Sequence, residues 1–581
     1  MRINELSLII GGDAGQGVES SGAGFCKALT RAGLHVFSVQ ENRSRIRGGH
    51  NYYLIKTSEG PILSWDEDVH VVVALTAESV ELHVEKIERG GAVIYDSEFD
   101  VDVDKIKKSG VTPVAVPINE IAKEHGSKIM SNTAALGALA GLTQFDITYI
   151  YSVIESNFKK KGEKIVEANR KVAVNAYNYV RENYGDVFSR ELQAIGNTER
   201  MIMNGNQAIA VGALVAGCNF VSAYPMTPGT SIFEWLNSHA DEYGIVAKQT
   251  EDEIAAIIMA IGAAHVGARS LVPTSGGGFS LMVEGLGLAG MLEDPVVVVI
   301  AQRPGPGTGL ATRSEQSDLL FAIHAHQSEF PRIVLAPGDV KQCYEAGARA
   351  MNLAEKYQTP VIIMTEAFLT KSYRTLEKDE IDFNAIEIDR GALLSEADLD
   401  KMSEPYKRYA FTESGISPRA VPGHPKAIYL STSNEHTEFG DISEDAEIRS
   451  RMNEKRMKKL ETALEDMNAP ELIGPQDADV TLICWGGTVC AVREVVKRVN
   501  EEGKMTANAL QFIDLWPFPE KKAVPLLEKA RKLVTVEGNY NAQLAMLIRM
   551  MSGIHITRKI LKYDGRPISP EYILSHLKEV I

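Results

Sequence analysis

An acid at the start of an apolar helix, with a proline-rich segment upstream, is the combination in this chain best suited to chemistry. Three consecutive acids end at Glu253, and a strongly apolar run, 254–264, follows them. We therefore expect Glu253 to be partly buried, which raises the pKa of a carboxyl and fits it for proton transfer. Upstream, two prolines flank Thr227 and hold its backbone extended, so that its hydroxyl can face a ligand. Acids at a helix start also suit its dipole, so the triplet alone does not establish a site.

A glycine-rich turn near the N-terminus is a second candidate site. Gly12, Gly15 and Gly17 lie between an expected strand, 6–10, and an expected helix, 18–32. The free backbone N–H groups of such a turn can hold a phosphate. The spacing differs from that of dinucleotide-binding proteins, and no ribose-binding acid follows convincingly at the usual distance. The segment could equally be a plain tight turn.

A basic segment follows this helix. Residues 42–50 contain three arginines beside Gly48 and Gly49. Guanidinium groups next to flexible backbone suit a phosphate or a carboxylate. A solvated basic loop is the alternative interpretation. The three arginines are Arg43, Arg45 and Arg47.

The composition is that of an ordinary soluble protein with several domains. The chain has 581 residues, of which 44% are hydrophobic and 24% charged, so about two to four domains are expected. Its formal net charge of −16 argues against binding to nucleic acid or to an anionic membrane. The first residues carry no signal pattern, and no apolar run approaches the roughly 18 residues of a membrane span. We therefore expect a cytoplasmic protein.

The cysteines are scattered, and no two are spaced as C-x-x-C. An iron–sulfur cluster needs about four thiolates, usually in closely spaced runs. We therefore expect this chain to hold no cluster, and we assign it no metal ligands. Scattered thiols in a long chain are typical of the reducing cytosol. They are Cys26, Cys218, Cys343, Cys484 and Cys490.

Strand and helix patterns alternate along most of the chain and predict an α/β fold. Such alternation implies parallel sheets with crossover helices. Residues 185–206 are polar and irregular, which suits a linker. Between 376 and 476 the composition becomes charged and rich in turns, with a surface helix expected at 452–460. From residue 477 the strand and helix pattern returns.

Three motifs together resemble one enzyme family. Tyr224-Pro-Met-Thr-Pro228, Glu251-Asp-Glu-Ile-Ala-Ala256 and Thr274-Ser-Gly-Gly-Gly-Phe-Ser-Leu-Met282 resemble the α subunits of 2-oxoacid:ferredoxin oxidoreductases. The resemblance is closest to the 2-oxoglutarate type, whose α subunit carries a γ domain fused at its N-terminus. Met226 and Gly229 stand where the common family motif has isoleucine and serine, and neither change removes a functional group.

The resemblance implies three folded domains, a linker and an insertion. Each of the three folded domains is expected to be of the α/β class. The segments are a γ-type domain at 1–184, a linker at 185–206, a pyrimidine-type domain that binds thiamine diphosphate at 207–375, a charged insertion at 376–476, and a transketolase C-terminal-like domain at 477–581.

The resemblance also implies roles for the acids and for one arginine. Glu253, rather than Glu251 or Asp252, is expected to bond nitrogen N1′ of the cofactor's aminopyrimidine ring, which assists removal of the thiazolium C2 proton. Arg313, in a flexible glycine-rich loop that suits a bidentate grip on a carboxylate, is expected to contact the 2-oxoacid together with Thr227.

The remaining expected contacts divide between cofactor and substrate. Arg45 and Arg47, with Arg43 as an open alternative, are expected near the substrate and coenzyme A. Contacts to thiamine diphosphate are expected from Tyr224, Pro225, Thr274, Ser275, Gly276 and Gly277.

A missing motif implies a partner. Thiamine enzymes bind the diphosphate through Mg²⁺ with a Gly-Asp-Gly motif, but here Gly440-Asp-Ile lacks the second glycine and lies in the charged insertion. A β subunit is therefore expected to supply the Mg²⁺–diphosphate site and a [4Fe–4S] cluster. The chain is expected to be active only with that subunit.

The expected reaction is oxidative decarboxylation of a 2-oxoacid to its acyl-CoA, with release of CO₂ and transfer of electrons to ferredoxin. 2-Oxoglutarate, which gives succinyl-CoA, is the favoured substrate, and the reverse carboxylation is also open. Alternatives are an enzyme for pyruvate, branched-chain or many 2-oxoacids, and a non-catalytic scaffold that binds a nucleotide through Gly11–Gly17.

Overall fold

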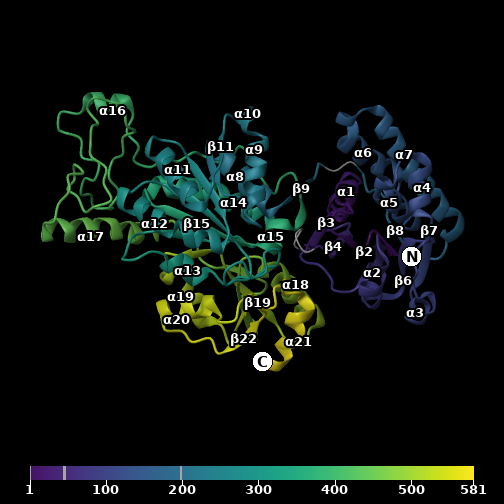
Figure 1. Ribbon diagram of the computed structural model, residues 1–581. Helices are drawn as coiled ribbons and strands as arrows, with labels where there is room; N and C mark the ends of the chain where they lie inside the picture. Colours follow the sequence, from purple (N-terminus) through teal and green to yellow (C-terminus); the bar gives the residue numbers. More distant parts are fainter. Residues whose placement is uncertain (1, 44–47, 197–198) are drawn as a thin grey trace. The chain divides into compact units, whose positions relative to one another are not determined.

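The structure, a computed structural model, describes residues 2–43, 48–196 and 199–581. Contacts divide the chain into two compact units, and the elements of each are labelled in Figure 1. The first unit comprises the residues up to Asn204 with two later segments, Lys371–Ile381 and Ser569–Tyr572. The second comprises the remainder. No helix among the described residues is long and apolar enough to cross a membrane.

An eight-stranded mixed sheet forms the centre of the first unit, in the order β7-β6-β5-β2-β4-β3-β16-β9. The strands from β2 to β7 in this order are parallel, but β4 is antiparallel to both β2 and β3. Antiparallel strands need only a short connection, so β3 and β4 join without a helix, and the prediction of parallel strands is wrong for this half of the sheet. The bounds are β2 (Leu6–Asp13), β3 (His35–Glu41), β4 (His50–Ser58), β5 (Val69–Ala74), β6 (Ile87–Asp96), β7 (Thr112–Val116), β9 (Met201–Asn204) and β16 (Tyr373–Leu376).

Helices cover this sheet and share one hydrophobic core with it. Phe25 and Leu29 of α1 belong to the same buried cluster as Leu8 and Ile10 of β2. Close packing of α5 on α7 depends on glycine, because a Cβ atom on Gly137 would lie 2.2 Å from the carbonyl oxygen of Ala173. The helices are α1 (Val18–Arg31), α2 (Ala77–His83), α3 (Val103–Lys108), α4 (Ile118–His125), α5 (Ser131–Leu142), α6 (Ile147–Phe158) and α7 (Glu163–Tyr184).

The segment 185–206, which we predicted to be a linker, contributes strands to the first unit. β8 (Arg190–Glu191) pairs in parallel with β1 (Arg2–Ile3), and β9 pairs antiparallel with β16. Edge strands are held by backbone hydrogen bonds, which a polar sequence does not prevent. The polar composition therefore did not reveal these strands.

A seven-stranded sheet forms the centre of the second unit, in the order β11-β10-β12-β13-β15-β14-β20. The first six strands in this order are parallel, and β20 is antiparallel to β14. β13 and β15 are buried along their whole length, as is usual for parallel strands covered on both faces. The bounds are β10 (Phe220–Ala223), β11 (Val246–Gln249), β12 (Ser270–Thr274), β13 (Val296–Gln302), β14 (Ile333–Leu335), β15 (Pro360–Glu366) and β20 (Asp514–Trp516).

Helices connect these strands and are seen around the sheet in Figure 1. They include α11, whose buried face carries Ala256, Ile257, Ala260 and Ile261. The bounds are α8 (Gly205–Val215), α9 (Thr230–Ser238), α10 (Ala240–Tyr243), α11 (Glu253–His265), α12 (Gly276–Leu292), α13 (Leu319–His324), α14 (Val340–Tyr357) and α15 (Ala367–Lys371).

A five-stranded sheet near the C-terminus shares its core with the seven-stranded sheet. Its order is β17-β19-β18-β21-β22. Trp485 and Phe512 of this sheet belong to the same buried cluster as Val298 and Ile300 of β13, so the two sheets have one continuous core. The bounds are β17 (Glu471–Ile473), β18 (Val480–Trp485), β19 (Ala507–Phe512), β21 (Leu533–Glu537), β22 (Arg558–Leu561), α18 (Thr488–Glu502), α19 (Glu520–Lys529), α20 (Gln543–Ser552) and α21 (Pro570–Val580).

The charged insertion carries α16 (Glu396–Lys401) and the longer helix α17 (Ala446–Ala463), which is anchored by buried ion pairs. We predicted a surface helix at 452–460, but Lys455 and Lys459 are buried and lie 2.6 and 2.5 Å from the carboxylate of Glu293. Burial alone would raise the pKa of Glu293, but the two ammonium groups and Arg408 hold that pKa well below its ordinary value. The helix therefore lies at the surface as predicted, with Glu454 and Lys458 exposed, but its inner face carries charged side chains, which can be buried where each meets a partner.

Candidate active site

The candidate site lies where four parallel strands of the second unit end. β11, β10, β12 and β13 are neighbours in the sheet and point the same way. The segments that follow them begin at Thr250, Tyr224, Ser275 and Arg303. Ligands of open α/β sheets bind outside the carboxyl ends of the strands. Most of the candidate site residues predicted from the sequence in this unit therefore lie at this edge of the sheet.

Glu253 is the buried acid of this edge. It begins α11, and the preceding Asp252 caps that helix by accepting a hydrogen bond from the N–H of Ala255 at 2.7 Å. Glu253 is only 2% exposed, and its Oε1 atom has no hydrogen-bond partner among the described residues. Burial raises the pKa of Glu253; the negative charge of Asp252 adds to the effect and Arg303 opposes it. The carboxyl is therefore held ready for a ligand that can donate or share a proton.

A glycine turn lies directly against this carboxyl. A Cβ atom on Gly278 would come within 2.6 Å of Glu253 Oε1 and 2.2 Å of Thr274 Oγ1, so only glycine fits there. Thr274 and Ser275 are fully buried, and Ser275 Oγ has no hydrogen-bond partner among the described residues. The sequence suggested Gly276 and Gly277 as contacts. It did not single out Gly278, although this is the glycine that contacts the acid.

The proline-rich segment packs against the same turn. A Cβ atom on Gly229 would lie 2.6 Å from the carbonyl oxygen of Thr274, so this segment rests on the end of β12. The amide of the buried Asn206 donates a hydrogen bond to the carbonyl oxygen of Pro228 at 2.9 Å. Tyr224 and Pro225 follow β10 directly and are exposed at this edge.

Arg303 is a site residue that the sequence analysis missed. Its Nη1 atom donates a hydrogen bond to the carbonyl oxygen of Thr227 at 2.7 Å. Burial lowers the pKa of Arg303, and the nearby Glu253 opposes that shift. Arg303 therefore stands between the proline-rich segment and the buried acid. Its position directly after an apolar strand could have indicated a site residue, but only with knowledge of the order of the strands in the sheet.

Arg313 lies in a different environment within the same unit. Its Cβ atom would be 3.1 Å from a Cβ atom on Gly565, and the next residue, Ser314, donates from its N–H to the Gly565 carbonyl oxygen at 3.2 Å. Burial lowers the pKa of Arg313 to about 10, and the positive charge of Arg566 contributes. The structure therefore places Arg313 beside the segment that follows β22.

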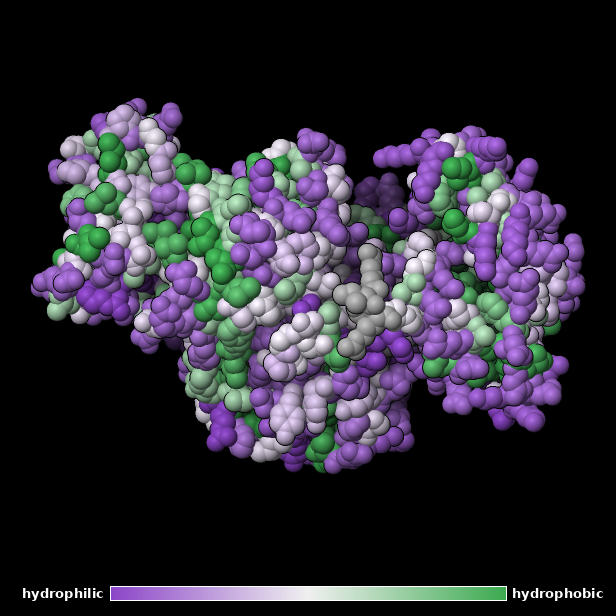
Figure 2. Space-filling view, viewed as in Figure 1, coloured by the Kyte–Doolittle hydropathy of each residue, from purple (hydrophilic) through white to green (hydrophobic). Residues whose placement is uncertain are grey.

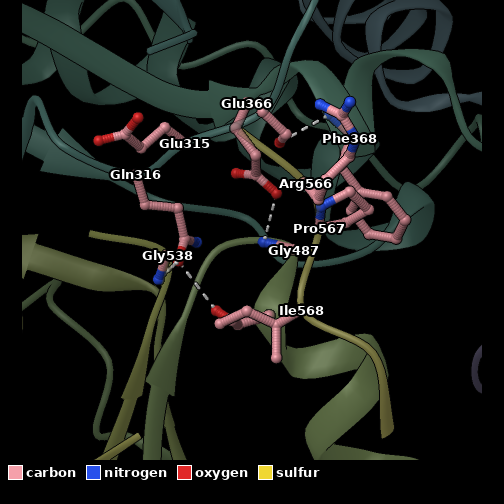
Figure 3. Close-up of a pocket in the computed structure, with 11 residues that line it drawn as sticks. Glu315, Gln316, Glu366, Phe368, Gly487, Gly538, Arg566, Pro567 and Ile568 are labelled. Atoms are coloured by element: carbon pink, nitrogen blue, oxygen red, sulfur yellow. Dashed lines mark hydrogen bonds between the residues drawn. The ribbon is translucent and has the colours of Figure 1, made fainter. Parts of the chain in front are cut away.

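A small cavity lies beside this segment, and Figure 3 shows its lining. Glu366, at the end of β15, accepts a hydrogen bond from the N–H of Gly487 at 2.9 Å. The cavity has a volume of about 20 Å³, enough for about one water molecule. Burial raises the pKa of Glu366 to about 8. The pocket is lined by Ser314, Glu315, Gln316, Glu366, Phe368, Gly487, Thr488, Gly538, Arg566, Pro567 and Ile568.

The first unit holds the second group of candidate residues. The glycine turn lies beside the basic segment, because the N–H of Ala14 donates to the carbonyl oxygen of Gly49 at 3.1 Å. Gly17 has the left-handed backbone angle φ 78° and precedes α1. Arg43 is fixed through its backbone N–H, which donates to Asn51 Oδ1 at 2.6 Å. Arg45 and Arg47 lie outside the described residues.

A larger cavity lies beside the first turns of α1, with a volume of about 340 Å³. Apolar and polar residues both line it, and the polar ones include Ser20, Asn132 and Lys161. The hydroxyl of Ser21, a buried residue on the same wall, has no hydrogen-bond partner among the described residues. The cavity can therefore take an apolar group with polar ends.

Three known families match successive parts of the chain. Residues 7–179 match pyruvate ferredoxin/flavodoxin oxidoreductase. Residues 211–455, which contain the strand-end site, match the thiamine diphosphate-binding domain of pyruvate flavodoxin/ferredoxin oxidoreductase. Residues 478–573 match core domain II of pyruvate:ferredoxin oxidoreductase.

Whole-length relatives agree with these matches. The chain is 35% identical to the α subunit of a 2-oxoacid:ferredoxin oxidoreductase from Sulfolobus sp, over 99% of this chain and 97% of that one. It is 28% identical to the 2-oxoglutarate oxidoreductase subunit KorA of Mycobacterium tuberculosis, over 94% and 87%. The 2-oxoglutarate:ferredoxin oxidoreductase of Magnetococcus marinus, solved with 2-oxoglutarate, coenzyme A and succinyl-CoA bound, superposes with a TM-score of 0.91 at 34% identity over 99% of both chains.

The fold and the matches define an oxidoreductase with a thiamine diphosphate-binding domain. The chain belongs to the 2-oxoacid:ferredoxin oxidoreductase family, as the resemblance of its motifs predicted, and is similar over nearly its whole length to α subunits of that family. The predicted α/β fold class is also confirmed. The site residues fit the cofactor, because the buried and unpartnered Glu253 oxygen can share a hydrogen bond with a ring nitrogen.

Proposed function

We propose that this chain is the α subunit of a 2-oxoglutarate:ferredoxin oxidoreductase that converts 2-oxoglutarate, coenzyme A and oxidised ferredoxin to succinyl-CoA, CO₂ and reduced ferredoxin. The observation that carries the proposal is the buried Glu253, whose unpartnered oxygen faces the glycine turn at the strand ends. The substrate is inferred from relatives, since a whole-length structural neighbour is named for 2-oxoglutarate and was solved with it. Two further relatives carry 2-oxoglutarate in their names.

Glu253 would act on the pyrimidine ring of thiamine diphosphate. When bound, the cofactor would supply a carbon nucleophile and an electron sink for decarboxylation. Glu253 would hold a proton between its Oε1 atom and ring nitrogen N1′, and its burial-raised pKa favours this sharing. Thr274 and Ser275, both fully buried, would keep water from the ring.

Arginine would bind a carboxylate of the substrate. Arg303 donates a hydrogen bond from Nη1 to the Thr227 carbonyl oxygen, and this bond holds its guanidinium group at the edge where Glu253 lies. A guanidinium group in a partly buried setting binds a carboxylate strongly. Arg313, which the sequence suggested, is the second candidate for this role.

Coenzyme A would be bound by the first unit. The N-terminus of α1 presents free backbone N–H groups to a phosphate, with Arg43 on the neighbouring segment. The adjoining cavity of about 340 Å³ has the mixed walls that an apolar arm with polar ends requires.

A partner subunit would cover an exposed apolar surface beside Glu253. Ile254, Ile258 and Met259 of α11 and Leu281 of α12 are 38–49% exposed, and Figure 2 shows apolar residues gathered over these two helices. Exposed apolar patches of this kind often mark protein interfaces. We infer that the β subunit docks here and brings the Mg²⁺–diphosphate site and the iron–sulfur cluster.

Reconstitution with the β subunit tests the proposal. The complex should reduce ferredoxin or a dye with 2-oxoglutarate and coenzyme A, and the α chain alone should not. A panel containing pyruvate, branched-chain 2-oxoacids and 2-oxoglutarate should give the highest kcat/KM for 2-oxoglutarate. Equal values across the panel would contradict the substrate assignment and leave the reaction class intact.

A further inference from the structure

A second carboxyl lies at the glycine turn, on the side opposite to Glu253's contact. A Cβ atom on Gly276 would come within 2.3 Å of Asp318 Oδ2, so the carboxyl of Asp318 rests on the first turn of α12. Its Oδ2 atom is buried and has no hydrogen-bond partner among the described residues. Glu253 and Asp318 therefore occupy the space beside Gly278 and Gly276, two residues apart on one turn.

The backbone of Asp318 is tied to the same sheet edge as the active site. Its N–H donates to Gln302 Oε1 at 3.0 Å, and the Gln302 amide donates to the carbonyl oxygen of Thr365 at 3.1 Å. Gln302 is fully buried and ends β13, and Thr365 belongs to β15. Asp318 is therefore a fixed part of the strand-end site.

No positively charged side chain among the described residues shifts the pKa of Asp318. Burial raises the pKa of Asp318 to about 6, and burial is the single cause of that shift. The first turn of α12 carries no titratable side chain, and β13 ends in the neutral Gln302, with Arg303 next in the chain. Glu315, on the same loop, has the same sign of charge and is affected by Asp318. Asp318 is only partly buried, but its buried Oδ2 atom without a partner costs stability, and proteins keep such groups mainly at functional sites.

We propose that Asp318 is a positioning residue of the active site, whose ionised carboxylate holds the first turn of α12 in place against Glu253. The inference rests on the proposed function, since it concerns the same site. The free N–H groups at a helix N-terminus attract a negative charge within the first turn. Protonation of Asp318 removes that attraction, and the turn then loosens at Gly278, where it contacts Glu253.

The pH dependence of activity tests this role. On the α–β complex with saturating 2-oxoglutarate and coenzyme A, kcat should fall on the acid side with a midpoint near pH 6. Asp318→Asn mimics the protonated state, so at pH 7.5 its kcat should be lower by about 10- to 100-fold and the acid limb should disappear. Asp318→Glu, which can still ionise, should retain an acid limb and part of the activity.

Glu315→Gln is the matched control, because Glu315 is a neighbouring carboxyl whose pKa is also raised by burial but which belongs to the lining of the Glu366 cavity. It should keep the wild-type acid limb. If Asp318→Asn retained wild-type kcat together with an unchanged acid limb, the proposal would be wrong. If Asp318→Asn failed to fold, a wild-type complex whose affinity for thiamine diphosphate did not change between pH 7.5 and pH 5 would contradict the proposal instead.

A binding measurement separates this inference from the proposed function. The affinity of the complex for thiamine diphosphate, followed by calorimetry, should weaken by about tenfold between pH 7.5 and pH 5 in the wild type. It should be weak and independent of pH in Asp318→Asn. A complex that bound the cofactor in this way without turning over any 2-oxoacid would contradict the proposed function and support the role of Asp318.

Discussion

At the scale of the residue, Glu253 has a raised pKa because it is buried, and its Oε1 atom has no hydrogen-bond partner among the described residues. Its neighbour Asp252 takes the helix-capping role, so Glu253 is not needed to begin α11. The Oε1 atom then remains without a partner in a buried position, which costs stability. A carboxyl kept at such a cost is best explained by a ligand that completes its hydrogen bond.

The first prediction concerns Glu253→Gln. Glutamine keeps the shape of the side chain but cannot share a proton, so kcat should fall by about 10²- to 10⁴-fold. The melting temperature should not fall, because the variant removes a buried and unsatisfied acid. Glu251→Gln, at an exposed acid of the same triplet, is the control and should retain activity. Wild-type turnover by Glu253→Gln would exclude it from proton transfer.

The second prediction separates the two arginines. Arg303 contacts Thr227 beside Glu253, whereas Arg313 lies beside Gly565. Arg303→Ala should raise KM for the 2-oxoacid by about 10-fold or more, since a charge-assisted contact contributes about 1.5–3 kcal/mol. Arg313→Ala should have the smaller effect. Steady-state kinetics on both variants decides, and a larger KM increase in Arg313→Ala would transfer the role to that residue.

At the scale of the element, the turn at the start of α12 packs against both carboxyls of the candidate site, Glu253 and Asp318. One face of this helix is buried by apolar residues such as Phe279, Met282 and Leu286, and at its start Gly276 leaves room for the side chain of Asp318 and Gly278 for those of Thr274 and Glu253. The third prediction is that Gly278→Ala abolishes cofactor binding, because a methyl group would lie 2.6 Å from Glu253 Oε1.

Gly262→Ala is the control for this variant. Gly262 lies in the neighbouring helix α11, where an added Cβ would meet no atom within 4 Å. Alanine should therefore leave Glu253 undisturbed and raise the stability of the isolated chain by up to about 1 kcal/mol, because it is the better helix former. Cofactor titrations and thermal melts on the two variants compare the same glycine-to-alanine change in two neighbouring helices. Wild-type cofactor affinity in Gly278→Ala would contradict the prediction and mean that the turn can move enough to accept the methyl group.

The fourth prediction concerns the contact of β15 with the start of α18. Burial raises the pKa of Glu366 from 4.5 to about 8, so the folded protein keeps a proton that the unfolded chain releases above about pH 4.5. The free energy of unfolding should therefore decrease as pH rises from about 4.5 to about 8 and level off above that range. Glu366→Gln cannot titrate and should lose this part of the slope.

Glu537 provides the contrast within the same unit. It is buried too, but its oxygens accept hydrogen bonds from the N–H groups of Leu544 and Ala545 and from Trp485. Glu537→Gln replaces an acceptor with a donor and should destabilise the protein at every pH, by about 1–3 kcal/mol. Thermal melts from pH 5 to pH 9 test both variants, and an unchanged slope in Glu366→Gln would contradict the assignment.

At the scale of the whole molecule, the sequence predicted where helices and strands occur better than it predicted which strands lie side by side. Glu253 could be found because an apolar helix follows it directly. Arg303 could not be found, because it reaches the site only when β13 lies beside β12, and no local sequence pattern encodes that pairing. For the same reason β9 was taken for a linker, since its partner β16 lies far away in the sequence. Long-range pairing of strands and buried charge pairs such as Lys455 with Glu293 are decided by tertiary structure.

The fifth prediction concerns assembly. A helix that packs only within its own chain would bury its large apolar residues, but α11 leaves Ile254, Ile258 and Met259 partly exposed beside the active site. Ile258→Asp places a charge in this surface and should weaken binding of the β subunit by about 100-fold or more, because an unpaired charge would be desolvated. Since Ile258 is exposed, the isolated chain should melt as the wild type does.

Leu82→Asp is the control, since Leu82 is an exposed apolar residue of α2 in the first unit. Size-exclusion chromatography of the mixed subunits should show the α–β complex for wild type and Leu82→Asp, and separate subunits for Ile258→Asp. Activity should follow assembly, because half of the cofactor site is expected on the partner. A stable, active complex with Ile258→Asp would mean that the β subunit covers another face, and the apolar surface of α11 would then need a different occupant.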